Sequence, residues 1–294
     1  MRTSDGVCIL SSAVTLIVLS VFGILINYFY YQYPGNNYFP PNTPMIAISL
    51  LLMYGGFSLQ FGYASRPARL LKEVVYFFLV MVILAFATNA AQYTPFPLID
   101  KQLVTYESTF GINLEAIIAW SHSMPVFKKL LALIYDSLPL QMSYIPLLVI
   151  AANRINLIRE YYFLLLFSAL IGFTFYYFFP TAAPASVIDS PYFSMAQKAT
   201  GLKFHQIHHY IKPTTLEGGM IALPSFHVIW AWFCLYLLRG WPLAFAIMLP
   251  INILLVASCV LLGWHYPVDL LGSLIVIIAA HGFYHIAHCH KVIL

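Results

Sequence analysis

Long apolar stretches, separated by short polar or proline-containing segments, run along most of the 294-residue chain. A helix needs about 20 apolar residues to cross the hydrocarbon core of a bilayer, and runs near that length recur about eight times here. They lie at Cys8–Tyr28, Pro44–Tyr63, Glu73–Ala91, Phe127–Ala152, Tyr161–Phe179, Ile221–Leu238, Trp241–Leu262 and Tyr266–His285. The pattern predicts an all-α, polytopic membrane bundle of about eight transmembrane helices, with little chain left for a soluble domain.

The composition points the same way. The chain is 61% hydrophobic and 8% charged, whereas soluble domains are about 25% charged. The first stretch is too long for a secretory signal, and Ile26–Phe29 offers no small-residue cleavage site, so we expect a retained anchor. The four cysteines, at positions 8, 234, 259 and 289, lack paired spacing and predict neither a disulfide framework nor a zinc site.

The segment Thr94–Pro97, with two prolines, marks a boundary along the chain. We expect a three-helix membrane region at residues 1–95 and a second membrane bundle at residues 96–294, with a long outer loop at residues 180–222. The segment Lys101–Ser123 has mixed polarity and is expected to lie along the outer membrane interface.

The fourth apolar stretch is interrupted at residues 136–139. Pro139 should kink this helix or delay its start. Asp136 is an ionisable group within an apolar run, which makes it a functional candidate. The alternative, which we favour, is that Asp136 and Ser137 cap a helix that starts near Pro139.

Two short histidine motifs each open an apolar stretch: Pro224–His227, which reads Pro-Ser-Phe-His, and His265–Asp269, which reads His-Tyr-Pro-Val-Asp. Their histidines are 38 positions apart, close to the length of two membrane helices of about 20 residues. The chain can therefore cross the bilayer and return between them. This spacing predicts that both motifs lie at the same membrane face.

His265 and Asp269 are four residues apart, so their side chains share one helix face. The carboxylate can accept the imidazole Nδ1–H and leave Nε2 free as a nucleophile or base. Each residue alone has a structural alternative: Asp269 suits a helix N-terminus, Pro224 and Ser225 suit a helix start, and His227 suits a packed core. Together, at helix N-termini that attract phosphate, they favour phosphoryl transfer, in which one histidine attacks phosphorus and the other protonates the departing oxygen.

The charge distribution suggests an orientation. With a cytoplasmic N-terminus, all six arginines fall on the cytoplasmic side, as the positive-inside rule favours. They are Arg2, Arg66, Arg69, Arg154, Arg159 and Arg239. We therefore expect a multi-pass membrane protein whose two histidine motifs face the periplasm, lumen or exterior.

The two motifs resemble the second and third signature motifs of the type-2 phosphatidic acid phosphatase superfamily. The closer likeness is to its inositol phosphotransferase branch, which includes fungal inositol phosphorylceramide synthase. Three details carry it: the segment Phe179–Pro184 before the outer loop, Ala222-Leu223 before the first motif, and Tyr266 after the predicted nucleophile. The likeness covers about Pro97–His285.

The resemblance implies a role for each matching residue. His265 matches the nucleophile that forms a phosphohistidine, Asp269 its orienting carboxylate, and His227 the general acid. Ser225 matches a donor to a phosphate oxygen, and Thr181 is a further candidate substrate contact. The implied chemistry needs neither a metal nor a cofactor, and it acts on a lipid phosphate with a lipid or polyol as acceptor.

Two departures from the family pattern stand out. The Ser-Arg pair of the family's phosphatases is Ser258-Cys259 here, so the arginine that clamps phosphate is absent, which favours a transferase. The first signature, Lys-x6-Arg-Pro, is also missing. Arg66-Pro67 has Leu59 at the position of the signature lysine, and the pair is expected at the opposite membrane face. Three lysines of the outer loop are the nearest candidates to neutralise a developing phosphoryl charge. They are Lys198, Lys203 and Lys212.

The remaining histidines form two clusters. His205, His208 and His209 in the outer loop could hold a metal or phosphate, although irregular loops often contain such groups. His281 lies sixteen residues beyond His265, roughly 24 Å along a helix, and so cannot join the outer site. His281 and His285 have helical spacing for a metal, but with His288 and His290 they suit interface anchoring better.

These observations favour an integral membrane phosphotransferase that acts on a lipid phosphate or phospho-headgroup through a phosphohistidine. A lipid phosphate phosphatase of the same superfamily is the alternative. A non-enzymatic lipid or ion transporter also stays open, since buried His and Asp serve as proton relays, although paired broken helices in matching halves are missing. A receptor or scaffold built on an inactive enzyme fold is a further alternative.

Overall fold

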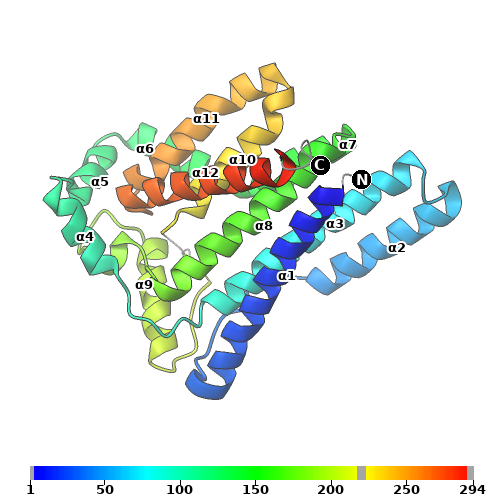
Figure 1. Cartoon of the computed structure of the whole chain (residues 1–294). Coiled ribbons are helices and arrows are strands. Elements are labelled where there is room, and N and C mark those ends of the chain that lie inside the picture. Colours follow the sequence, from blue (N-terminus) through cyan, green and yellow to red (C-terminus); the bar gives the residue numbers. More distant parts are fainter. Residues whose placement is uncertain (1–2, 217–222, 290–294) are drawn as a thin grey trace.

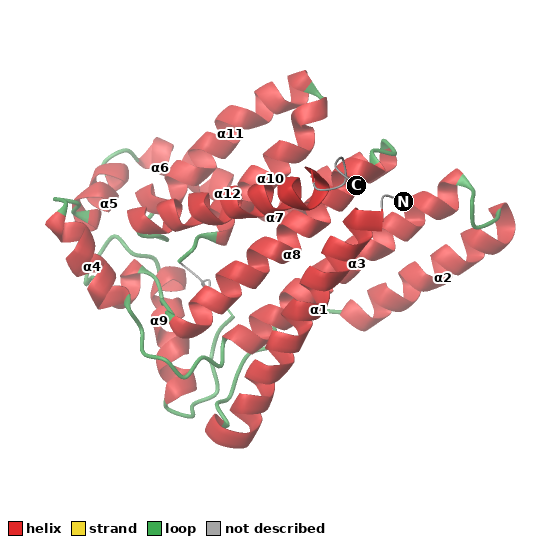
Figure 2. Cartoon of the chain, viewed as in Figure 1, coloured by secondary structure: helices red, strands yellow, loops and turns green. Residues whose placement is uncertain are grey.

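The computed structural model describes residues 3–216 and 223–289, and all regular structure within these ranges is helical (Figures 1 and 2). The α-helices are α1 Thr3–Ile26, α2 Thr43–Phe61, α3 Arg66–Ala91, α4 Asp100–Thr109, α5 Leu114–His122, α6 Pro125–Tyr135, α7 Leu138–Ala151, α8 Ile155–Phe178, α9 Met195–His208, α10 Phe226–Leu237, α11 Pro242–Leu261 and α12 Pro267–Cys289. The π-helical turn Asn27–Tyr31 and the 3₁₀ turns Pro184–Ser186 and Leu238–Gly240 complete the set.

Six of these helices are long and apolar enough to cross a membrane: α1, α2, α3, α8, α11 and α12. Two further apolar helices, α7 and α10, are shorter, with 14 and 12 residues. The predicted all-α membrane bundle is therefore confirmed, and the count of about eight holds only if these two short helices are included.

The fourth predicted stretch, Phe127–Ala152, is not one straight span. The chain breaks between α6 and α7, and α5 and α6 meet at a bend of 109°. The break falls where Pro139 predicted it, with Ser137 as the N-cap of α7. The Ser137 hydroxyl donates to the Ile134 carbonyl (2.6 Å) instead of capping α7, and Asp136 is exposed. The expected side-chain cap is wrong, although the expected helix start is right.

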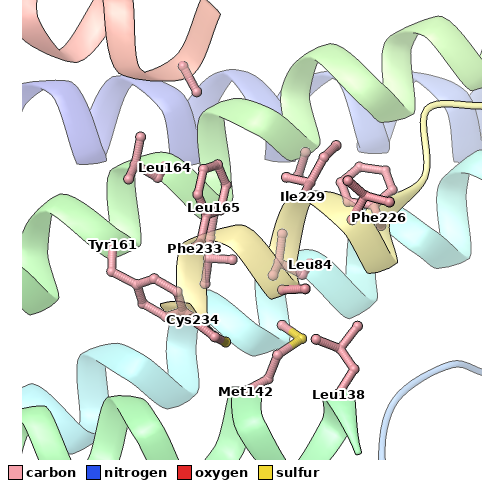
Figure 3. Packing of buried hydrophobic residues seen from close by; sticks show 14 of the residues in the cluster. Leu84, Leu138, Met142, Tyr161, Leu164, Leu165, Phe226, Ile229, Phe233 and Cys234 are labelled. Carbon is pink, nitrogen blue, oxygen red and sulfur yellow. Dashed lines mark hydrogen bonds between the residues drawn. The ribbon is translucent and has the colours of Figure 1, made fainter. Parts of the chain in front are cut away.

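The core of the bundle forms around α8 and α10. Helix α8 packs against α1, α3, α7, α10 and α12. Helix α10 packs against α7, α8, α11 and α12, and most of its side chains are buried. Figure 3 shows Phe226, Ile229 and Phe233 of α10 in one cluster with Leu165 of α8 and Met142 of α7. Because Phe226, Val228 and Ile229 of its first turn are buried against these neighbours, the residues there have a fixed position.

The two ends of the bundle differ in chemistry. At the end where α8 begins and α10 finishes, Arg159 pairs with Glu73 (2.5 Å) and Arg239 pairs with Glu160. The two histidine motifs lie at the other end, where α10 and α12 begin. The beginnings of α8 and α12 lie at opposite ends of the bundle (Figure 1), so the arginine pairs and the motifs are far apart.

Candidate active site

The first motif is held by the start of α10. Ser225 is the N-cap, and its hydroxyl accepts the Val228 N–H (3.5 Å). Pro224 therefore precedes the cap and lies just outside the helix. Ser225 is completely buried, and Ser273 of α12 donates to its carbonyl (3.0 Å).

Two glycines allow this segment to approach its neighbours closely. A Cβ on Gly172 of α8 would lie 2.5 Å from the Phe226 ring, and a Cβ on Gly272 of α12 would lie 2.9 Å from Leu223. Real Cβ atoms do not come this near, so a side chain at Gly172 would have to move the Phe226 ring, and one at Gly272 the end of the Leu223 side chain. Gly172 thus permits the close approach of the first motif to α8, and Gly272 permits its approach to α12, which carries Asp269.

The second motif is positioned by a glycine turn. Helix α11 ends at Leu261, and Gly263 adopts φ +81°, a left-handed conformation. The chain then turns back so that the His265 N–H donates to the Cys259 carbonyl (2.9 Å). A Cβ on Gly263 would also lie 2.6 Å from Ile118 and 2.8 Å from Phe193.

Gly263→Ala is therefore expected to destabilise the protein and misplace His265. The left-handed conformation costs a residue with a side chain about 1–2 kcal/mol, and overpacking adds roughly 1–3 kcal/mol. Gly111→Ala is the matched control, because Gly111 has φ +72° but open space around it. The thermal midpoint of unfolding in detergent should fall further for Gly263→Ala, and equal shifts in the two variants would contradict the packing argument.

His265 and Asp269 make the predicted contact. The His265 Nδ1–H donates to Asp269 Oδ2 (3.1 Å), which also accepts the Tyr266 N–H (2.9 Å). This leaves His265 Nε2 unprotonated, and Nε2 lies 3.1 Å from the Ser225 hydroxyl, which donates to it. His265 is only 4% exposed and Asp269 is fully buried. An unprotonated imidazole nitrogen thus faces a hydroxyl of the other motif.

His227 completes the group from α10. Its ring centroid lies 5.9 Å from that of His265. The ring stacks on Tyr135 at 4.2 Å, and the Tyr135 hydroxyl is 3.4 Å from His227 Nδ1. Tyr135 in turn stacks on Trp264 at 5.5 Å. Asp136, which the sequence left as a functional candidate, is exposed, and its neighbour Tyr135 is the residue that contacts the site.

A family model of the PAP2 superfamily matches residues 101–283, more than half of the chain. The chain belongs to the PAP2 superfamily. The matched range contains both histidine motifs and leaves α1–α3 outside. Comparison with curated proteins and with solved structures gave no match. With its six long apolar helices, this PAP2 protein is a membrane enzyme of the phosphatase type.

Two carboxylates of α4, unnoticed in the sequence, support the second motif of this PAP2 protein. Asp100 is fully buried and accepts the Tyr266 O–H on Oδ1 and the Ala182 N–H on Oδ2, each at 2.9 Å. Glu107 accepts the Val268 N–H (2.8 Å). Burial raises the pKa of Asp100 to about 6, although these hydrogen bonds oppose it, and also raises the pKa of Glu107. Helix α4 thereby fixes the loop that carries His265.

Asp100→Asn is expected to lower kcat/KM by about 10- to 100-fold, because the loop shifts and the nucleophile is misplaced. The asparagine amide has a single acceptor oxygen, whereas the Tyr266 O–H and the Ala182 N–H each donate to a different oxygen of Asp100. In the wild type, Asp100 loses its proton as the pH rises through about 6, so this residue adds to the rise of activity there. The variant should lack that part of the pH profile of kcat/KM. Asp189→Asn, at an exposed loop position, is the control, and an unchanged profile for Asp100→Asn would refute the role.

The outer region 180–222 is not the irregular loop that the sequence suggested, since it contains α9. Ser194 caps this helix through a reciprocal capping box with Gln197. His205 and His209 lie one turn apart on α9 with their rings stacked at 3.9 Å, and His208 is packed between aromatic rings. Across 3–216 and 223–289, the structure has no group of three or more metal-ligating side chains.

The predicted substrate-binding lysines do not converge on the histidines. Lys198 and Lys212 are exposed. Lys203 is buried on α9, lies 5.9 Å from the centre of the Tyr38 ring, and has its pKa lowered to about 8 by burial. It lines a small cavity together with Thr181. Among the three lysines, only Lys203 is therefore linked to the motif region.

Thr181 and Cys259 border the first motif. Thr181 is fully buried, and its hydroxyl accepts the Leu223 N–H (3.4 Å), one residue before Pro224. Cys259, at the position of the missing arginine, is also fully buried, and its thiol donates to the Leu255 carbonyl (3.5 Å). The position that carries a cation in the family's phosphatases is thus occupied by a small neutral side chain.

The histidines at the far end of α12 are remote from the site, as predicted. His281 accepts a hydrogen bond from the indole N–H of Trp232 (3.0 Å), and His285 is exposed. The side chain of His288 and the whole of His290 lie outside the described residues. His281 thus has a packing role within the bundle.

Proposed function

We propose that the chain is a phosphotransferase that moves a phosphoryl group, or a phosphate with its headgroup, from a membrane lipid to an acceptor through a covalent intermediate on His265. The observation that carries this proposal is the orientation of His265. Asp269 holds the proton on Nδ1, and Nε2 presents its lone pair to the polar centre formed by Ser225 and His227.

In the first half-reaction, His265 Nε2 attacks phosphorus as the bond from phosphorus to the lipid oxygen breaks. His227 donates a proton to the departing oxygen, which leaves as a hydroxyl. Ser225, which donates to Nε2 in the resting state, turns its O–H to a phosphate oxygen as negative charge develops. Asp269 stabilises the positive charge of the phosphorylated imidazole.

In the second half-reaction, an acceptor hydroxyl attacks phosphorus, and His227 takes its proton. The P–N bond breaks, and His265 returns to its neutral form. Water in place of the acceptor would make the enzyme a lipid phosphate phosphatase. Two features favour a lipid or polyol acceptor: the burial of Ser225, His265 and Asp269 and the neutral Cys259 in the place of a phosphate-clamping arginine.

The proposed orientation puts the arginine end of the bundle in the cytoplasm and the histidine motifs at the periplasmic, lumenal or exterior face. Arg154, which lies over Trp241 at 5.6 Å, belongs to the cytoplasmic end with Arg159 and Arg239. This arrangement follows the positive-inside rule. The lipid substrate would then come from the outer leaflet.

The test is a panel of lipid substrates given to the purified protein. Phosphatidic acid, a prenyl pyrophosphate and phosphatidylinositol are supplied with and without ceramide or diacylglycerol. A headgroup transferred to the acceptor is the expected result. Release of inorganic phosphate at the same rate without acceptor would establish the phosphatase instead, and no turnover of any member would favour the non-enzymatic alternatives.

A further inference from the structure

A groove of about 690 Å³ runs along the outside of α10, α11 and α12, below the two histidine motifs. Its walls are almost entirely hydrocarbon, with Asn252, His281 and the Trp232 indole as the polar groups. The lining residues are Val228, Trp232, Leu235, Leu249, Asn252, Ile253, Val256, Leu274, Ile277, Ile278, His281 and Gly282.

On α10, the groove continues directly from the first motif. Ser225, Val228, Trp232 and Leu235 are spaced by three or four residues, so they follow one stripe of the helix. The last three line the groove, and Ser225 is the hydroxyl that contacts His265 Nε2. The stripe from Val228 to Leu235 is about 10 Å long.

The other two walls lead to the same place. On α11, Asn252, Val256 and Cys259 follow one stripe, and Cys259 contacts Ser225 at its upper end. Val256 is about 4.5 Å below Cys259 along the axis.

On α12, Ile277 lies one turn below Ser273, which donates to the Ser225 carbonyl. Each wall of the groove therefore ends at Ser225 or at a residue that touches it.

We propose that this groove holds one hydrocarbon chain of the lipid whose phosphate reacts at His265. The inference rests on the proposed function and adds that the hydrocarbon chain of the substrate determines which lipids the enzyme accepts. A phosphate bound beside His265 Nε2 and the Ser225 hydroxyl would have its attached chain at the end of the groove nearest the motifs, which Val228, Val256 and Leu274 line. The hydrogen bond between Trp232 and His281 (3.0 Å) and the nearby Asn252 form a polar band lower in the groove. A hydrocarbon chain long enough to reach this band meets polar groups, so the band limits the chain length that the groove accepts.

Narrowing the groove provides the first test. Leu274→Trp puts an indole at a 52% exposed groove position, and Ile275→Trp puts it at the adjacent 68% exposed position outside the groove. The ratio of kcat/KM for long-chain phosphatidic acid to that for a short-chain, water-soluble analogue should fall about tenfold or more in Leu274→Trp. Ile275→Trp should leave the ratio unchanged. An unchanged ratio in both variants, or an equal fall in both, overturns the proposal.

Binding without turnover provides the second test. Phosphatidic acid with a photoreactive group midway along one acyl chain is cross-linked to the His265→Ala protein, and the labelled peptides are mapped. Labelling should fall on α10–α12 and be displaced by unlabelled phosphatidic acid but not by phosphatidylcholine. Equal displacement by phosphatidylcholine would show bulk lipid only, and labelling at the separate groove between α1, α3 and α8 would also overturn the proposal. Since this readout needs no catalysis, failure of the proposed function alone would leave the labelling in place.

Discussion

His265→Ala is expected to lower kcat by about ten-thousand-fold or more, because it removes the atom that forms the bond to phosphorus in the proposed mechanism. Loss of a covalent nucleophile has an effect of this order in other enzymes. The measurement is turnover of whichever lipid in the substrate panel the wild type uses. The same protein incubated with ³²P-labelled lipid should yield no acid-labile, base-stable phosphoenzyme, which the wild type should form.

The control for this variant is its fold. The His265 side chain makes hydrogen bonds to Asp269 and Ser225. Its backbone N–H donates to the Cys259 carbonyl, and this hydrogen bond, which the substitution retains, also holds the loop in place. The expression level and the thermal midpoint of unfolding should therefore change much less than the turnover rate. Asp269→Asn keeps the size of the side chain but removes the carboxylate, and should reduce turnover while a phosphoenzyme still forms slowly. Full activity in folded His265→Ala protein would end the assignment of the nucleophile.

The sequence predicted the central contacts because they are local or set by membrane thickness. His265 and Asp269 are one helical turn apart, so their contact follows from helix geometry alone. The distance of 38 residues to His227 is the length of a hairpin of two helices, and the bilayer fixes how such a hairpin folds. The apolar stretches likewise predicted the membrane helices, except where α6 and α7 divide.

The supporting residues could not be found in this way. Asp100 contacts Tyr266 across 166 positions, and no periodicity or motif links two single residues so far apart. The contact of Tyr135 with the site could not be predicted for a different reason. One aromatic residue in an apolar chain rich in aromatic residues has no distinguishing sequence signal. For α9, a signal existed: Ser194 and Gln197 have capping-box spacing, but the polar composition of residues 195–208 favoured a loop.

His227→Ala is expected to reduce turnover of alkyl lipid phosphates by about 10²- to 10⁴-fold, the usual contribution of a general acid. An alkoxide is a poor leaving group unless it receives a proton as the bond breaks. A phenolate leaves without one. An aryl phosphate that carries the same acyl chain should therefore phosphorylate His265 in the variant at nearly the wild-type rate.

The time course separates the two roles of His227. With the aryl substrate, the variant should release one equivalent of phenol per enzyme in a burst and then turn over slowly, because no base activates the acceptor. Tyr135→Phe is the matched control: it keeps the ring that stacks on His227 at 4.2 Å and removes only the hydroxyl, so it should change the burst little. An equal loss of rate for alkyl and aryl substrates in His227→Ala would mean that His227 positions the phosphate instead of moving a proton, since a positioning defect does not depend on the leaving group.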